Sequence, residues 1–594
     1  MAALLNFAGF RPVPYGVLRS FGQSGLFGAV ALLLVLAVML QGTWHTWDLP
    51  WGDGASYFAR AQRVATEFRF PLFEWAPVHA GYYGLFHFLL ADFSPFTIYF
   101  VYRVTTWLLL AWLLLALLRQ MMSPLLSWLL AVYGLFLLIY LGDGFTAHLF
   151  VLLPLLLACL ALFLTTPYRH GLMLTCLLLA ATTRTELFLP FLLLLGLVLY
   201  EDWTGTRRTA VTGQRRWYYL PLVLTIVLLS LILAFRSVER EQHRSWIAFG
   251  QHYARGYREN VPAWDADQLP GWVEITQHSF ADASSISDAL RHNPAAFGQH
   301  LWWNVRRLPT AVTETFFPTA SWSRTQQQIV GLAVLLGTLL CGRFLWQRRE
   351  LWLADHAEAR LKVGLIWSVT AVASLGAMLM VQPRPRHVVV LLPLFLLLLG
   401  MVLDLNLRRF NWHERLSGAV PWLVVVLLFL LPTPFKAGDG RPVLSMVAQL
   451  KLYDQAQAQP YGLLTAPAFG LCAYVGSDRC RPLEIYQVPR EDHPFEQLLA
   501  ERNIQVIFVT PWLVQNLPPN GRDYVQQLRD DPAHLGWDQI DSIRQFELYA
   551  RSSSHQGMVH WPTVQILTED RRRRTELDWL SVFRLPSSVS KLSS

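Results

Sequence analysis

Long apolar runs without a charged side chain constrain this chain more than any other feature. Residues 108–118, 149–164 and 388–401 are three such runs. A soluble fold would have to bury them completely, whereas a lipid bilayer accepts them as helices of about 20 residues. Charged residues make up 15% of the chain, hydrophobic residues 53%, and the mean hydropathy is +0.32. The sequence therefore predicts a mainly α-helical, polytopic membrane protein.

About eleven transmembrane helices are expected from the lengths of the apolar segments. They are placed near residues 26–43, 96–118, 124–141, 145–165, 171–183, 187–200, 218–236, 327–345, 363–381, 388–406 and 418–433. The fifth and sixth segments are short, which indicates broken or tilted helices. No small-residue cleavage site follows the first segment, so no cleavable signal peptide is predicted.

The positions of the arginines predict how these helices are oriented. When the loops are assigned alternately to two faces, one face collects most loop arginines, and the positive-inside rule makes it cytoplasmic. They are Arg11, Arg19, Arg119, Arg169, Arg207, Arg208, Arg215, Arg216, Arg343, Arg348, Arg349, Arg408, Arg409 and Arg415. The net charge of +8 is therefore read as a topology signal, and nucleic-acid binding is not expected.

The same assignment places two long loops, 44–95 and 238–325, and everything after the last span outside. We expect residues 1–433 to form the transmembrane domain and residues 434–594 to form a small extracytoplasmic α/β domain. Three β-prone runs are expected as its strands, at 462–466, 505–510 and 546–549. Cys472 and Cys480 could form a disulfide in such an oxidising compartment.

Ionisable side chains gather at the outer ends of the spans. They are Asp48, Asp53, Asp143, His148, Arg184, Glu186, Arg384, Arg386 and His387. Ionisable groups at membrane depth are costly, which makes them candidates for function. Gly-rich phosphate loops, zinc-type cysteine pairs and nucleophile elbows are not found in the sequence. The chemistry is therefore expected at this outer face.

Among the acids, Asp53 is the candidate for catalysis, because it follows the first span between two glycines that leave its carboxylate accessible. Asp143 precedes the fourth span and either caps that helix or assists Asp53. Asp48 is expected to be solvated.

Among the cations, Arg384 and Arg386 alternate with prolines and form a stiff pair suited to phosphate. The alternative is topological anchoring, but arginines on the outer face oppose the positive-inside bias. Arg184 is expected to pair with Glu186 at the interface or to join the phosphate site. Arg103, early in the second span, is either an anchor or a phosphate ligand.

The order of these residues resembles that of a known superfamily. The run from Trp51 to Ala61 looks like the first outer loop of the GT-C glycosyltransferases, especially the protein O-mannosyltransferase and aminoarabinose transferase branch. Further matching pieces are Arg103, Asp143, Thr183-Arg184, and Arg386-His387 followed by Leu391-Leu392-Pro393. The resemblance covers roughly the first 430 residues in the order of elements.

The resemblance implies that Asp53 is the catalytic base and that the donor is a polyprenyl-phosphate sugar. The other expected site residues are Asp143 beside the base and, at the donor phosphate, Arg384, Arg386, His387, Arg184 and Arg103. The acceptor is a glycan, lipid or protein hydroxyl, and displacement of the phosphate would invert the sugar carbon. No organic cofactor is expected. A divalent metal is left open, because Gly54 stands where many relatives carry a second acid.

The resemblance also implies a multi-pass protein of a bacterial inner membrane that contacts membrane lipid, with an extracytoplasmic active site.

Two other functions fit a protein with many spans and with charges at their outer ends. A lipid or sugar transporter or flippase would usually show an internal repeat and polar residues at mid-membrane, and neither is evident. A transferase with a pyrophosphate-linked donor is the closer enzymatic alternative.

The loop 238–325 contains five tryptophans that suit either sugar stacking or interfacial anchoring. They are Trp246, Trp264, Trp272, Trp302 and Trp303.

Overall fold

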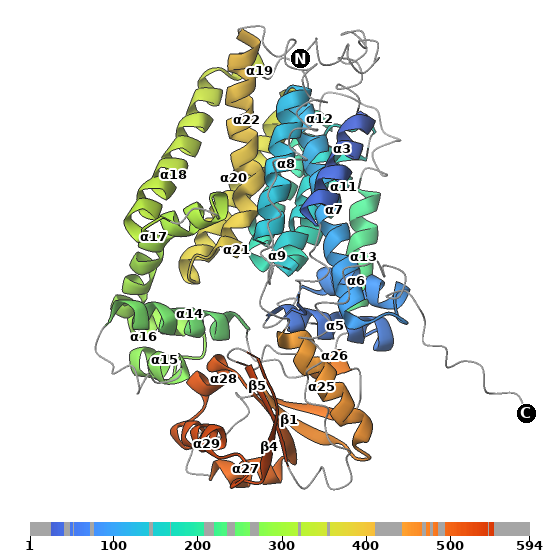
Figure 1. Cartoon of the computed structure of the whole chain (residues 1–594). Helices are drawn as coiled ribbons and strands as arrows, with labels where there is room; N and C mark the ends of the chain where they lie inside the picture. Colours follow the sequence, from blue (N-terminus) through green and yellow to red (C-terminus); the bar gives the residue numbers. More distant parts are fainter. Residues whose placement is uncertain are drawn as a thin grey trace, which may run out of the picture.

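Helices dominate the computed structural model of this chain (Figure 1). It describes residues 25–40, 48–50, 53–71, 76–141, 146–166, 168–206, 219–234, 244–261, 272–318, 322–352, 357–409, 442–465, 471–475, 479–484, 494–543 and 546–551. The helices of the bundle are α3 (Gly25–Met39), α7 (Pro95–Met121), α8 (Pro124–Tyr140), α9 (Thr146–Phe150), α10 (Leu152–Ala161), α11 (Arg169–Thr183), η2 (Thr185–Leu187), α12 (Phe188–Thr206), α13 (Leu220–Ala234), α18 (Arg324–Gln347), α19 (Arg349–Trp352), α20 (Ala357–Met380), α21 (Pro385–Val388), η5 (Val389–Leu391) and α22 (Leu392–Arg409).

Five helical segments among the described residues are long and apolar enough to cross a membrane. They are Pro95–Met121, Thr185–Thr204, Arg324–Gln347, Ala357–Met380 and Pro385–Arg409. Shorter apolar helices cover Gly28–Met39, Pro124–Tyr140, Ala147–Ala161 and Leu220–Ile232. These helices indicate a multi-pass membrane protein. The expected eleventh span, 418–433, lies outside the described residues, so the count of eleven stays a prediction.

The two long loops fold into helices of their own. The first contains α5 (Asp53–Glu67) and α6 (Pro77–Leu89), which pack against each other. The second contains α14 (Arg244–Asn260), α15 (Trp272–Phe280), α16 (Ile286–His292) and α17 (Pro294–Phe316). Helix α14 is strongly amphipathic, and Phe249 and Tyr253 on its apolar side pack with Phe280 and Phe297 in a separate small core. These helices lie at the end of the bundle nearer the sheet (Figure 1).

A five-stranded mixed sheet follows the bundle, in the order β2-β1-β3-β5-β4. Its strands are β1 (Tyr461–Thr465), β2 (Cys480–Glu484), β3 (Ile504–Val509), β4 (Trp537–Ile543) and β5 (Phe546–Arg551). Its helices are α25 (Pro442–Ala456), α26 (Leu471–Val475), α27 (Phe495–Glu501), α28 (Pro511–Asn516) and α29 (Pro519–Asp530). β1 pairs in parallel with β2 and β3, whereas β5 is antiparallel to β3 and β4.

The three strands expected from the sequence are confirmed as β1, β3 and β5, and the sheet contains two more. A disulfide between Cys472 and Cys480 joins α26 to β2, as the sequence suggested. β2 contains Pro482 and β4 is largely polar, so neither shows the apolar pattern by which the others are recognised. Both are edge strands of the sheet, where a proline and polar side chains are tolerated.

The expectation that Asp48 is solvated is wrong. Its carboxylate accepts hydrogen bonds from the backbone N–H groups of Val443 (2.8 Å) and Leu444 (2.7 Å), in the first turn of α25. Nearby, the hydroxyl of Tyr474 on α26 donates to the carbonyl of Pro50 at 2.5 Å. The sheet region is thereby attached to the chain segment just before α5.

Candidate active site

The first turn of α5 lies beside the short helix α9. Asp53 begins α5, but its side chain is outside what the structure describes, as is the whole of Asp143. One turn later, Tyr57 packs in a small buried cluster with Ala147, the residue before His148. The segment that carries Asp53 is therefore next to the segment that carries His148.

A group of basic side chains meets near the same end of the bundle. We call Arg184, His252, Arg384, Arg386 and His387 the cationic cluster. Arg386, Arg184 and Arg384 all act electrostatically on the ring of His387. Arg184 follows α11, Arg384 precedes α21, and Arg386 lies in α21. The His252 ring, from α14, is 6.1 Å from that of His387 between centroids. Four of the expected phosphate ligands are thus brought together.

The ring of His148 extends this cluster toward α5. Its centroid is 5.2 Å from that of His387, and the two rings are tilted by 37°. Ala147, next to His148 in the chain, belongs to one buried cluster with Tyr57 and Ala76, so the cationic cluster and the start of α5 are near each other.

Some buried nitrogen atoms of the cluster have no hydrogen-bond partner within the described part of the chain. They are Nδ1 of His252, Nδ1 of His387 and Nη1 of Arg184. His252 and His387 are only 7% and 5% exposed, so water has little access to them. An unsatisfied buried polar group costs about 1–3 kcal/mol. A bound anion would accept from Arg184 and from the N–H tautomer of either ring.

Burial and the cluster together keep His252 neutral. Burial, and then the positive charges of Arg384 and neighbouring groups, hold the pKa of His252 well below its usual value. His252 is therefore neutral at pH 7 when no anion is present. A phosphate placed among these side chains would offset the positive charges and raise that pKa.

Arg184 has two roles in this geometry. Its Nε and Nη2 atoms donate to the carboxylate of Glu186, in the interfacial pair expected from the sequence. Its third guanidinium nitrogen, Nη1, is left for another acceptor. The ion pair fixes the arginine without using all of its donors.

Arg103 is not part of the cationic cluster. It is 2% exposed, its Nη1 donates to the hydroxyl of Tyr99 at 2.6 Å, and its guanidinium lies 4.8 Å from the ring of Trp107. Next to it, the hydroxyl of Tyr102 bonds to Nε2 of His79 at 2.8 Å. Burial lowers the pKa of His79 to about 3. The described contacts of Arg103 are with aromatic side chains, and its role as a phosphate ligand stays a prediction.

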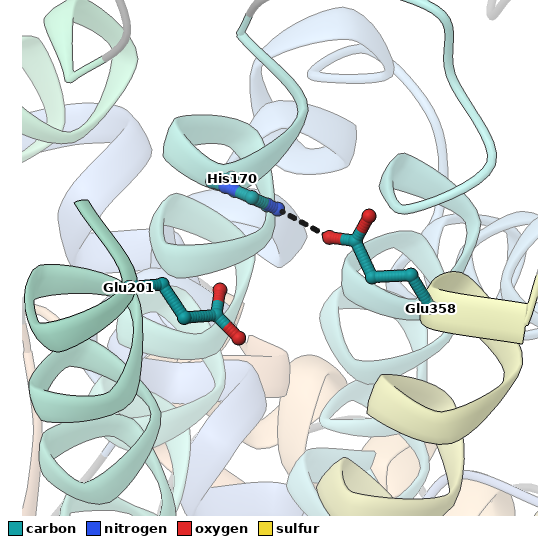
Figure 2. A group of neighbouring side chains, drawn as sticks. All are labelled: His170, Glu201 and Glu358. Atoms are coloured by element: carbon teal, nitrogen blue, oxygen red, sulfur yellow. Dashed lines mark ion pairs between the residues drawn. The ribbon is translucent and has the colours of Figure 1, made fainter. Parts of the chain in front are cut away.

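One group among the described residues has the spacing of a metal site: His170, Glu201 and Glu358 (Figure 2). The ammonium of Lys362, 5% exposed, lies within reach of all three. Its Nζ is 2.6 Å from Oε2 of Glu201, 2.9 Å from Oε1 of Glu358 and 3.2 Å from Nε2 of His170. Together with Arg169, which is 2.9 Å from Oε2 of Glu358, this cation already neutralises the two carboxylates. The group is an ion-pair network joining α11, α12 and α20 at the end of α20 away from α21.

Sequence reasoning missed the part that His252 plays in the cluster. His252 lies in the long loop 238–325, and no motif near it in the sequence marks it. The amphipathic pattern of α14 was the available signal: His252 and Phe249 are three residues apart and therefore share a face.

No family model matches the chain, and no curated protein matches it. Similar solved structures include the archaeal oligosaccharyltransferase AglB of Archaeoglobus fulgidus, in complex with an inhibitory peptide and a dolichol-phosphate. It aligns with a TM-score of 0.44 and 11% identity over 82% of this chain and 69% of that one. ArnT of Cupriavidus metallidurans, bound to undecaprenyl phosphate, aligns with a TM-score of 0.35 and 12% identity over 88% and 97%.

Both proteins are GT-C glycosyltransferases, the superfamily that the sequence motifs resemble. At TM-scores below 0.5, the alignments carry no correspondence between individual residues. The roles proposed below therefore come from the residues of this chain.

Proposed function

We propose that this protein is a glycosyltransferase that moves a sugar from a polyprenyl-phosphate donor to an acceptor hydroxyl. The reaction takes place on the extracytoplasmic face of a bacterial inner membrane and inverts the sugar carbon. The observation that carries the proposal is the cationic cluster. Its three arginines meet two buried histidines, and buried nitrogens among them lack partners within the described residues.

The cluster suits the phosphate of a lipid donor. Guanidinium groups present paired N–H donors that match phosphate oxygens. Arg384 and Arg386 stand at the start of a long apolar segment, Pro385–Arg409, so a phosphate held there would stay at the membrane surface. The polyprenyl chain would remain in the bilayer, and the sugar would point toward α5 and the sheet region.

The reaction itself needs a base and a stabilised leaving group. Asp53 takes the proton of the acceptor hydroxyl as its oxygen bonds to the anomeric carbon, with Asp143 assisting. The bond from that carbon to the phosphate oxygen breaks, and the phosphate leaves with the electron pair. Fixed cations of the cluster stabilise the charge that develops on it. Attack from the side opposite the phosphate inverts the carbon.

The sheet region would stand over this site. We propose residues 434–594 as an extracytoplasmic domain and residues 1–433 as the catalytic membrane domain. The contact of Asp48 with α25 supports the placement, because it ties the sheet region to the chain five residues before Asp53. A glycan, lipid or protein acceptor would approach from this side.

Turnover of a panel of polyprenyl-phosphate sugars by the full chain in nanodiscs tests the proposal, with one pyrophosphate-linked sugar included. We expect transfer from at least one phosphate donor and a rate lower by about 10²- to 10⁴-fold in Asp53→Asn, with donor binding retained. Near-normal turnover by the folded variant would remove Asp53 from its role. Transfer only from the pyrophosphate-linked sugar would overturn the donor class.

A further inference from the structure

A polar pocket of about 240 Å³ lies between α14, α17 and α18, and Gln382 closes it from the segment after α20. It is smaller than the roughly 300–1,000 Å³ of pockets that hold drug-sized ligands, and so suits a single sugar ring. Trp303 contributes its indole to the wall, and an aromatic face is a common support for such a ring.

Gln382 forms the buried back wall of this pocket. The residue is 1% exposed, and its amide nitrogen donates to Oε2 of Glu259 at 3.2 Å. Within the described residues, its amide oxygen has no hydrogen-bond partner. The opposite orientation of the amide would place that oxygen against the carboxylate. Gln382 therefore holds Glu259 at the back of the pocket.

The charges around the pocket favour a ligand with an acidic group. Arg307 is neutralised by Glu259, whose Oε2 lies 2.5 Å from Nη1 of the arginine. Arg306 and Arg324 also line the pocket, are exposed, and form no ion pair within the described part of the chain. Two positive charges are thus left at the rim.

The walls of the pocket are held in place by packing. A Cβ atom on Gly331 of α18 would lie 1.8 Å from the carbonyl oxygen of Pro309, so only glycine allows the two helices to approach this closely. The hydroxyl of Thr313 donates across the same contact to the carbonyl of Gln327 at 2.6 Å. Asn304 donates to the carbonyl of Leu379 at 2.8 Å. The pocket is preformed, which lowers the cost of binding.

We propose that this pocket binds a saccharide unit that carries a carboxylate or phosphate, as a recognition subsite for the acceptor. The acceptor role rests on the proposed function, whereas the binding itself does not. Gln382 is two residues from Arg384, so the pocket adjoins the cationic cluster. The sugar ring lies beside Trp303, and the acidic group meets Arg306 and Arg324.

Saturation-transfer NMR on the full chain in nanodiscs tests the binding without donor or transfer. The probes are glucuronate, glucose 6-phosphate, glucose and acetate. We expect both acidic sugars to bind about tenfold more tightly than glucose, because charged hydrogen bonds are stronger than neutral ones, and acetate not to bind, because it lacks the ring. Equal binding of glucose and the acidic sugars would overturn the charge argument, and no saccharide binding would overturn the site.

Variants locate the binding. Arg324→Gln should weaken the acidic sugars about tenfold and leave glucose unchanged, while Arg343→Gln, the same charge change elsewhere on α18, should change neither. Gln382→Glu keeps the size and one oxygen acceptor but places a carboxylate beside Glu259, and should weaken all the sugars. An unchanged affinity in Arg324→Gln would refute the subsite. If the unsubstituted chain binds the acidic sugars but transfers no sugar from any donor, the proposed function is contradicted and the binding site is not.

Discussion

The carboxylate of Asp48 accepts a hydrogen bond from the backbone N–H of Val443 at 2.8 Å, across most of the length of the chain. A second bond joins it to the N–H of Leu444. The first N–H groups of a helix have no partner within the helix, and a carboxylate there is also favoured by the helix dipole. Asp48 therefore acts as a remote cap that fixes α25 to the membrane region.

Replacing Asp48 by Ala should loosen this attachment. We expect a loss of about 0.5–2 kcal/mol, the usual cost of removing a helix cap. Faster amide hydrogen exchange over residues 443–450 measures it. Asp48→Asn keeps one oxygen acceptor and should lose less. Asp531→Ala, which breaks a similar bond to the N–H of His534 within the sheet region, should leave exchange in α25 unchanged.

Arg384 and Arg386 should determine donor affinity. A lysine cannot reproduce the paired donors of a guanidinium group, so we expect Arg386→Lys to raise the donor Kd about tenfold. Replacing both arginines by Gln should be worse and should slow the single-turnover rate about 10²-fold, because the departing phosphate loses its compensation. The control is Arg348→Gln at the C-terminal end of α18, which should change neither the donor Kd nor the single-turnover rate. Wild-type values in the double variant would mean that the phosphate is held elsewhere.

Stability should fall on mild acidification because of buried histidines. Burial lowers the pKa of His79 to about 3 and that of His87 to about 4. The ordinary pKa of a histidine is 6.5. Below that pH, both side chains bind a proton in the unfolded chain but not in the folded chain. Each group then costs about 1.4 kcal/mol per pH unit as the pH falls from 6.5 toward its folded pKa, and nothing above 6.5.

Thermal melting between pH 7.5 and 4.5 measures this dependence. His79→Gln can keep a bond to Tyr102 without titrating, so its stability should fall less steeply below pH 6.5. His534→Gln, at an exposed position, should follow the wild type. A variant of His79 with the wild-type slope would show that this histidine does not titrate as its burial requires.

The orientation of the chain can be measured with introduced cysteines. Ser553→Cys should react with an impermeant thiol reagent added to intact cells, and Thr212→Cys only after lysis. Both positions lie outside the described residues, so the expectation rests on the arginine distribution. The unsubstituted chain gives the background from Cys159, Cys176 and Cys341. Reversed labelling would move the proposed site to the cytoplasmic side.

Local sequence determined much of the architecture. The length of an apolar run decides whether a segment can be a membrane helix, and each run was visible without knowing its neighbours. β3 was predicted in the same way, from a short apolar run. The structure buries Val506, Ile507 and Phe508 of that run completely. β4 was not, because its polar residues are stabilised by pairing with β5, which is a contact and not a property of the segment.

The sequence alone also put Asp53, Arg184, Arg384 and Arg386 on one list of outer residues. Only the tertiary structure decided which of the cations meet: it joined His252 to them and left Arg103 among aromatic rings. The physical reason is that charge and hydropathy are properties of each residue, whereas proximity depends on how helices distant in the chain pack. The same packing turned Asp48 from an expected solvated acid into the cap of a helix almost four hundred residues away.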